Sequence, residues 1–135
     1  MDAKNEYLLL IRGKAWWNRL PPEELQKTMD HVKAWFERLT ESGQLNVAQP
    51  LARKGAIVSG KTGRVIADGP FAEAKEVIGG YALLQVEGLD EAIAIAKSCP
   101  TLRFDMEIEV RPVAEECPMT KHARQIRSEE QLATV

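Results

Sequence analysis

Hydrophobic residues along the chain form short apolar runs that alternate with longer stretches of helical spacing. The run at residues 7–11 has no polar alternation and ends at Arg12 and Gly13, so its length favours a strand buried on both faces. A helix is predicted from Pro21 to about Gly43, because proline and acidic residues suit a first helical turn and glycine suits a helix end. Its apolar stripe, which should face a sheet, consists of Leu25, Met29, Val32, Phe36 and Leu39.

The middle and the end of the chain predict a hairpin, a second helix and further strands. Residues 54–59 and 64–68 are short segments rich in β-branched residues around a glycine-bracketed turn, which is typical of a hairpin. Residues 81–87 form another run that is apolar on both faces, and residues 104–110 alternate apolar and acidic positions as a last strand. A second amphipathic helix is predicted between them, with an inward stripe of Leu89, Ala92, Ile93 and Ala96.

This order of elements predicts an α+β fold of the ferredoxin-like type, with helices on one face of the sheet and an inserted hairpin. The other face would expose Tyr81, Leu83 and alternate residues of 7–11, an apolar patch larger than soluble monomers usually show. We therefore expect a homodimer in which two sheets pack together as a dimeric α+β barrel, since two-fold dimers are the commonest oligomers. Residues 1–113 are assigned to the domain, and residues 114–135 are either a surface helix or a partly disordered tail.

Composition narrows the classes of function. The 135 residues are 44% hydrophobic and 28% charged, which is typical of a single globular domain. A net charge of −2 without a basic stripe argues against direct binding to nucleic acid. Cys99 and Cys117 form no C-x-x-C pair, so we predict neither a disulfide framework nor a metal site, and no cofactor motif is present. The apolar runs are too short for a membrane span, and we expect a cytoplasmic location.

A specific motif follows the predicted hairpin. It reads DGPFAEAKE at residues 68–76 and is followed by GGY at residues 79–81. This motif resembles the signature of the YCII-related (DGPF) family, and the similarity extends over about residues 6–113. The resemblance implies the dimeric ferredoxin-like barrel. It also implies two kinds of function, because some relatives are encoded with or fused to alternative sigma factors, whereas others are proposed enzymes with a His and Asp pair in a cleft.

Two residues are candidates for catalysis. Asp68 ends a predicted strand beside Gly69 and Pro70, so it either lines a pocket at the sheet edge or caps its own turn. His31 lies in the first helix, in the region of the histidine proposed for some relatives, and suits a base near neutral pH. Helical geometry also places His31 on a solvent-facing flank, and Asp30 is adjacent to it and points elsewhere.

The candidates for ligand binding are aromatic and basic. Trp16 and Trp17, with Trp35 beside the helical stripe, either line an aromatic cleft or close a core or an interface. Arg12 and Arg64 either bind an anionic ligand or pair with neighbouring acids. Tyr81 is the remaining candidate for ligand binding. Two functions stay open: a dimeric small-molecule-binding or enzyme-like barrel, and a non-catalytic accessory protein linked to sigma-factor regulation.

Overall fold

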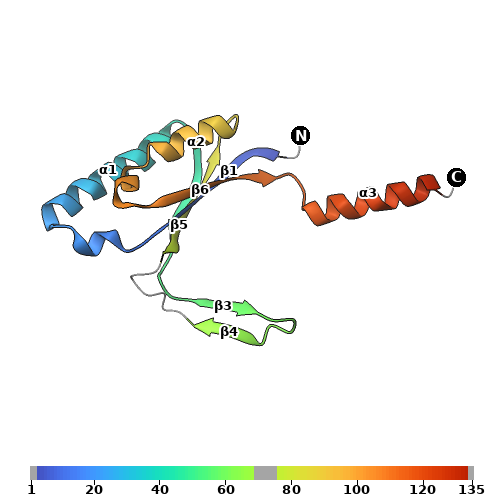
Figure 1. Cartoon of the computed structure of the whole chain (residues 1–135). Helices are drawn as coiled ribbons and strands as arrows, with labels where there is room; N and C mark the ends of the chain where they lie inside the picture. The colour runs from blue at the N-terminus through green and yellow to red at the C-terminus, as the bar shows by residue number, and fades with distance from the viewer. Residues whose placement is uncertain (1–2, 69–75, 134–135) are drawn as a thin grey trace.

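Four strands form one open antiparallel sheet in the computed structural model, which describes the backbone of residues 3–68 and 76–133 and the side chains of residues 5–65 and 76–133. Their order across the sheet is β2-β5-β1-β6. The strands are β1 (Ala3–Gly13), β2 (Leu45–Pro50), β5 (Val77–Gln85) and β6 (Glu107–Ala114). Helices α1 (Pro22–Glu41) and α2 (Leu89–Lys97) lie along the same side of this sheet (Figure 1). The chain is thus a mixed α+β structure whose own sheet does not close into a barrel.

The central strand β1 presents alternate residues to the two faces of the sheet, as extended backbone requires. Tyr7 and Leu9 are buried in the core beneath the helices. Leu8 and Leu10 point to the opposite face, where they stay partly exposed. The strand predicted at residues 7–11 is confirmed, although β1 extends beyond it at both ends.

Helix α1 has the predicted start and end, but its buried face is rotated relative to the predicted stripe. Met29 is 53% exposed, so its assignment to the inward stripe was wrong. Thr28 and Trp35 are buried instead, at 1% and 2% exposure. The Thr28 hydroxyl donates to the carbonyl oxygen of Glu24 at 3.0 Å and accepts from Arg103 at 3.0 Å, so burial leaves this polar group paired.

Trp35 joins α1 to the end of α2. Its indole Nε1 donates to the hydroxyl oxygen of Ser98 at 2.7 Å, and that hydroxyl donates to the carbonyl oxygen of Ile95 at 2.6 Å. The indole is therefore a core residue with its one donor satisfied. On α2 the buried positions are Ala92, Ile95 and Ala96, while Leu89 is exposed, which corrects the predicted stripe of this helix as well.

The last strand begins later than the alternation of residues 104–110 predicted. A 3₁₀ helix, η2 (Pro100–Phe104), precedes it, and Asp105 then turns the chain with a left-handed φ of 61°. Phe104 leaves the sheet and stacks on Trp16, with ring centroids 4.5 Å apart and planes 4° from parallel. Proline readily starts a 3₁₀ turn. The alternation of apolar and acidic residues from residue 104 onward does not show where this turn ends and the strand begins.

Two elements extend away from the sheet (Figure 1). The predicted hairpin is confirmed as β3 (Ala56–Ser59) and β4 (Val65–Asp68), inserted between β2 and β5. Its base is closed where the N–H of Leu51 donates to the carbonyl oxygen of Gly79 at 2.8 Å. Helix α3 (Pro118–Ala133) follows β6 and buries none of its described side chains.

Candidate functional site

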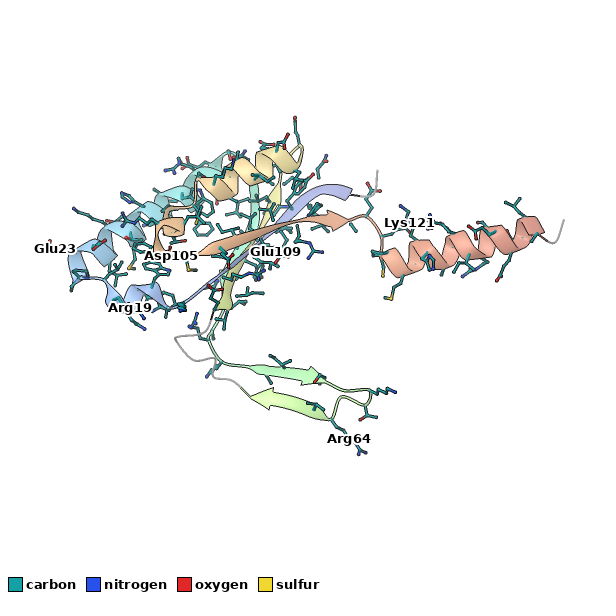
Figure 2. All side chains as sticks on the ribbon, viewed as in Figure 1. Arg19, Glu23, Arg64, Asp105, Glu109 and Lys121 are labelled. Atoms are coloured by element: carbon teal, nitrogen blue, oxygen red, sulfur yellow. The ribbon has the colours of Figure 1, made fainter. Side chains whose placement is uncertain are left out.

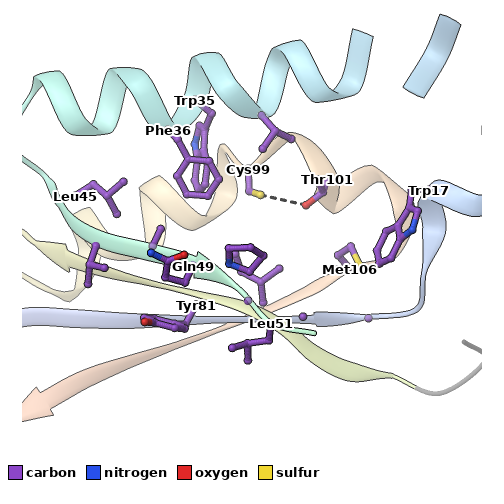
Figure 3. A pocket seen from close by; sticks show the side chains of 18 of the residues that line it. Trp17, Trp35, Phe36, Leu45, Gln49, Leu51, Tyr81, Cys99, Thr101 and Met106 are labelled. Atoms are coloured by element: carbon purple, nitrogen blue, oxygen red, sulfur yellow. Dashed lines mark hydrogen bonds between the residues drawn. The ribbon is translucent and has the colours of Figure 1, made fainter. Parts of the chain in front are cut away.

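A cavity of about 740 Å³ lies between α1 and the β2 edge of the sheet. Figure 3 shows Trp35 and Phe36 reaching toward it from α1, with Leu45 near β2. Its other end is bounded by Trp17 and Met106 (Figure 3). Helix, sheet and the two 3₁₀ turns therefore all contribute to one largely apolar wall.

The tryptophans at one end of the cavity belong to η1 (Trp16–Arg19), the turn that follows β1. Trp16 is fixed by its stack on Phe104, and the Trp17 ring meets it edge to face at 5.7 Å and 87°. Trp17 is 39% exposed, and the Arg53 guanidinium carbon lies 5.9 Å from its ring centroid. This separation is within the range of a cation–π contact, so the aromatic end of the cavity carries a cation at its rim.

Two glycines make the closest approaches in the cavity wall. A Cβ at Gly80 would lie 3.1 Å from the carbonyl oxygen of Gln49, so the missing side chain lets β2 approach β5. A Cβ at Gly13 would overlap the sulfur of Met106, which packs directly against the glycine. At both positions a neighbouring part of the wall occupies the space that a side chain would need.

The polar groups of the cavity are few and mostly uncharged. Cys99 Sγ and Thr101 Oγ1 are 3.3 Å apart, and either atom is able to donate (Figure 3). Asn46 donates its amide to the side-chain oxygen of Gln85 at 3.2 Å. Among the described residues that line the cavity, Arg53 is the single charged side chain, and none is a carboxylate or a histidine. This wall is suited to enclosing an apolar body rather than to moving protons between an acid and a base.

The predicted site residues fall into separate places. Trp16, Trp17 and Tyr81 line the cavity together. Arg12 lies outside that lining and forms an ion pair with Glu109 of the neighbouring strand, and Figure 2 marks Glu109 on β6.

The other candidates are not part of the described lining. Arg64 stands at the turn of the hairpin, away from the sheet (Figure 2), and His31 is exposed on α1. The backbone of Asp68 ends β4 opposite Ala56. The side chain of Asp68 and residues 69–75 of the DGPF motif lie outside the described residues.

Sequence reasoning missed Arg53, Met106 and the pair Cys99 and Thr101 as lining residues. Arg53 follows β2 in the chain, at the edge of the sheet. Its place in the lining therefore could not be predicted without first recognising β2 as a strand. Met106 had been placed in a strand, and its place against Gly13 follows only once the strand begins at Glu107.

The residues that the structure describes contain neither a candidate metal centre nor a candidate membrane span. Among the described side chains, those of residues 5–65 and 76–133, no three or more His, Cys, Asp or Glu are grouped as metal ligands. In the same part of the chain, no helix combines the length and the apolar character needed to cross a bilayer.

Fold and cavity together define a mixed α+β protein with an aromatic-lined pocket between α1 and the β2 edge of its sheet. Residues 6–122, most of the chain, match the model of the YCII-related domain. The chain is also 32% identical over 99 residues to an uncharacterized protein of Rhizobium meliloti (strain 1021), covering 68% of this chain and 77% of that protein. The chain belongs to the YCII-related family, which confirms the resemblance seen in its DGPF and GGY segments.

Proposed function

We propose that this protein binds a small molecule in the cavity between α1 and the sheet and that it does so as a homodimer. The cavity is the observation that carries the proposal. Its volume of about 740 Å³ is within the range of small-molecule sites, roughly 300–1,000 Å³. Its mainly apolar wall with a few placed polar groups is the composition that such sites share.

The proposed fold type is ferredoxin-like. When the β3–β4 hairpin is set aside, the remaining elements follow one another as β1, α1, β2, β5, α2 and β6. The strand order β2-β5-β1-β6 and the two helices on one face support this assignment. A ferredoxin-like sheet of this kind has one face left to cover.

The uncovered face supports the dimer. Leu83 of β5 pairs in register with Leu8 of β1 on one side and Val47 of β2 on the other, so the three apolar side chains share this face. The chain exposes 9899 Å². A compact monomer of this length exposes only about 7,100 Å². The hairpin and α3, which extend away from the sheet, contribute to this excess of roughly 2,800 Å² together with the uncovered face. In the proposed assembly two sheets pack face to face and complete the α+β barrel.

A charge at the centre of this face tests the dimer. We expect Leu83→Lys to convert the dimer into a folded monomer in sedimentation at micromolar concentration, because a lysine there would be buried without a partner. Met29→Lys, on the exposed side of α1, is the matched control and should leave the dimer intact. A wild-type protein that sediments as a monomer would contradict the proposed assembly.

Ligand binding is tested by a thermal-shift screen of metabolites on matched variants. A ligand of the cavity should stabilise the wild type, since binding to the folded state alone raises the unfolding temperature. Val32→Phe fills part of the cavity wall and should remove that shift, whereas Met29→Phe on the exposed side of the same helix should retain it. Equal shifts for both variants would place the binding elsewhere and contradict the proposal.

Catalytic roles for Asp68 and His31 stay predictions. The variants Asp68→Asn and His31→Gln belong in the same screen, because a shift lost in either one would connect that side chain to the ligand. The division of the chain at residue 113 and a cytoplasmic location likewise stay predictions.

The alternative function is a non-catalytic accessory protein linked to sigma-factor regulation. Its support is the exposed surface of the hairpin, where Ile57, Val58 and Val65 are all more than half exposed. A sigma-factor gene beside the gene for this protein would favour this alternative, and a metabolic operon would disfavour it.

A further inference from the structure

We infer that the ligand of the cavity is an amphipathic organic anion, with an apolar body among the aromatic side chains and an acidic head group at Arg53. This inference rests on the proposed function, because it names the class of molecule that the same cavity accepts.

The wall of the cavity determines the body. Phe36, Val32 and Leu45 line it, and Trp17 and Met106 bound its far end. A charged or strongly polar group placed there would lose its hydration without gaining hydrogen bonds from the protein. Burial of such an unpaired group costs several kcal/mol. Partly exposed aromatic faces on Phe36 and Trp17 instead favour a ring, which stacks or meets them edge to face.

The positive charge at the rim of the cavity determines the charge of the head group. Arg53 is partly buried and is the one charged side chain among the described residues of the lining. Its guanidinium lies 5.9 Å from the centroid of Trp17, and this contact holds the cation at the aromatic end of the cavity. A guanidinium attracts a carboxylate through its positive charge and charge-assisted hydrogen bonding, and a partly dry rim strengthens that attraction. A cationic ligand would be repelled at the same point.

The three tryptophans provide the readout. Trp16, Trp17 and Trp35 are all the tryptophans of the chain, and all three line the cavity. Their fluorescence, excited where a phenyl ring does not absorb, therefore reports occupancy of this site. The probes are phenylbutyrate, phenylbutanol and phenylbutylamine, which share one apolar body and differ only in the charge of the head group.

We expect phenylbutyrate to bind the wild type about tenfold more tightly than phenylbutanol, because a hydrogen bond to a charged group is worth about 1.5 kcal/mol or more. Phenylbutylamine should bind most weakly. Arg53→Gln should bring the anion to within about twofold of the alcohol, and Arg53→Lys should retain part of the preference, since it keeps the charge and loses the guanidinium. Arg64→Gln, at the turn of the hairpin, is the matched control and should change nothing.

The outcomes separate this inference from the proposed function. Equal binding of the anion and the alcohol, unchanged in Arg53→Gln, would overturn the anionic head group and leave the cavity as a binding site. Absence of quenching by all three probes would overturn the inference as a whole, and the metabolite screen with Val32→Phe would then decide the proposed function by itself. Circular dichroism of each Arg53 variant shows that a lost preference is not a lost fold.

Discussion

The hydrogen bond between Trp35 and Ser98 gives the sharpest test of how the helical layer is held together. Trp35 is 2% exposed, and its Nε1 lies 2.7 Å from the Ser98 hydroxyl. Ser98→Ala removes this acceptor and leaves a buried donor unpaired, which costs about 1–3 kcal/mol. We expect about 1–2 kcal/mol, because Ser98 lies near solvent and a water molecule offsets part of the loss.

A double-mutant cycle isolates the pair. Trp35→Phe removes the donor together with part of the ring and should cost about 2 kcal/mol through lost packing. When Ser98→Ala is added to Trp35→Phe, no hydrogen-bond donor is left unpaired. The double variant should therefore lose about 1 kcal/mol less free energy of unfolding than the sum of the losses in the two single variants.

Urea unfolding followed by circular dichroism measures these free energies. One fixed protein concentration is used for all variants, since the stability of the proposed dimer would depend on concentration. Ser128→Ala on the exposed surface of α3 is the control and should stay within about 0.5 kcal/mol of the wild type. A Ser98→Ala loss below about 0.5 kcal/mol, with an additive cycle, would refute the reasoning, because water would then replace the serine fully.

Two further predictions concern a cysteine and a glycine. Cys117 immediately precedes α3, and hydrogen bonds from the backbone N–H groups of Met119 and Thr120 lower the pKa of its thiol. Its alkylation rate follows the thiolate and should therefore reach half of its maximum at a lower pH in the folded protein than in urea; identical midpoints would contradict this. Gly13→Ala should destabilise the fold by about 1–3 kcal/mol, because the φ of 158° at Gly13 disfavours a side chain and the added methyl group overlaps the Met106 sulfur. The second change Met106→Ala makes room for that methyl group, so the double variant should lose less than the two single variants together, and full additivity in urea unfolding would refute the contact.

The fold could be predicted where periodicity and burial agree. The apolar run at residues 7–11, the spacing of α1 and the glycine-bracketed hairpin each identified an element that the structure contains. β2 was missed because Leu45–Pro50 is an edge strand that buries little and mixes polar residues with apolar ones. Helical spacing puts Trp35 beside the apolar stripe, and its burial could not be predicted because the hydrogen-bond partner of its indole, Ser98, lies 63 positions away.

The candidate site could be predicted only in part, for a related reason. Trp16 and Trp17 are predicted either to line an aromatic cleft or to close a core or an interface, and in the structure both line the cavity. Arg12 and Arg64 are predicted either to bind an anionic ligand or to pair with neighbouring acids; Arg12 pairs with Glu109 across β1 and β6, and Arg64 lies at the turn of the hairpin, away from the cavity. The cation at the rim of the cavity is Arg53, and its position there follows only from the path of β2.

The closed base of the β3–β4 hairpin has a consequence for how this protein is able to change over evolutionary time. Because Leu51 and Gly79 are joined by a backbone hydrogen bond, the chain leaves and re-enters the sheet at neighbouring points. Doubling the length of a flexible excursion between such fixed ends costs only about 0.6 kcal/mol in closure entropy. Insertions and deletions there leave the register of the sheet strands unchanged. We therefore expect homologous proteins to differ in the length and sequence of this hairpin while keeping the same pocket.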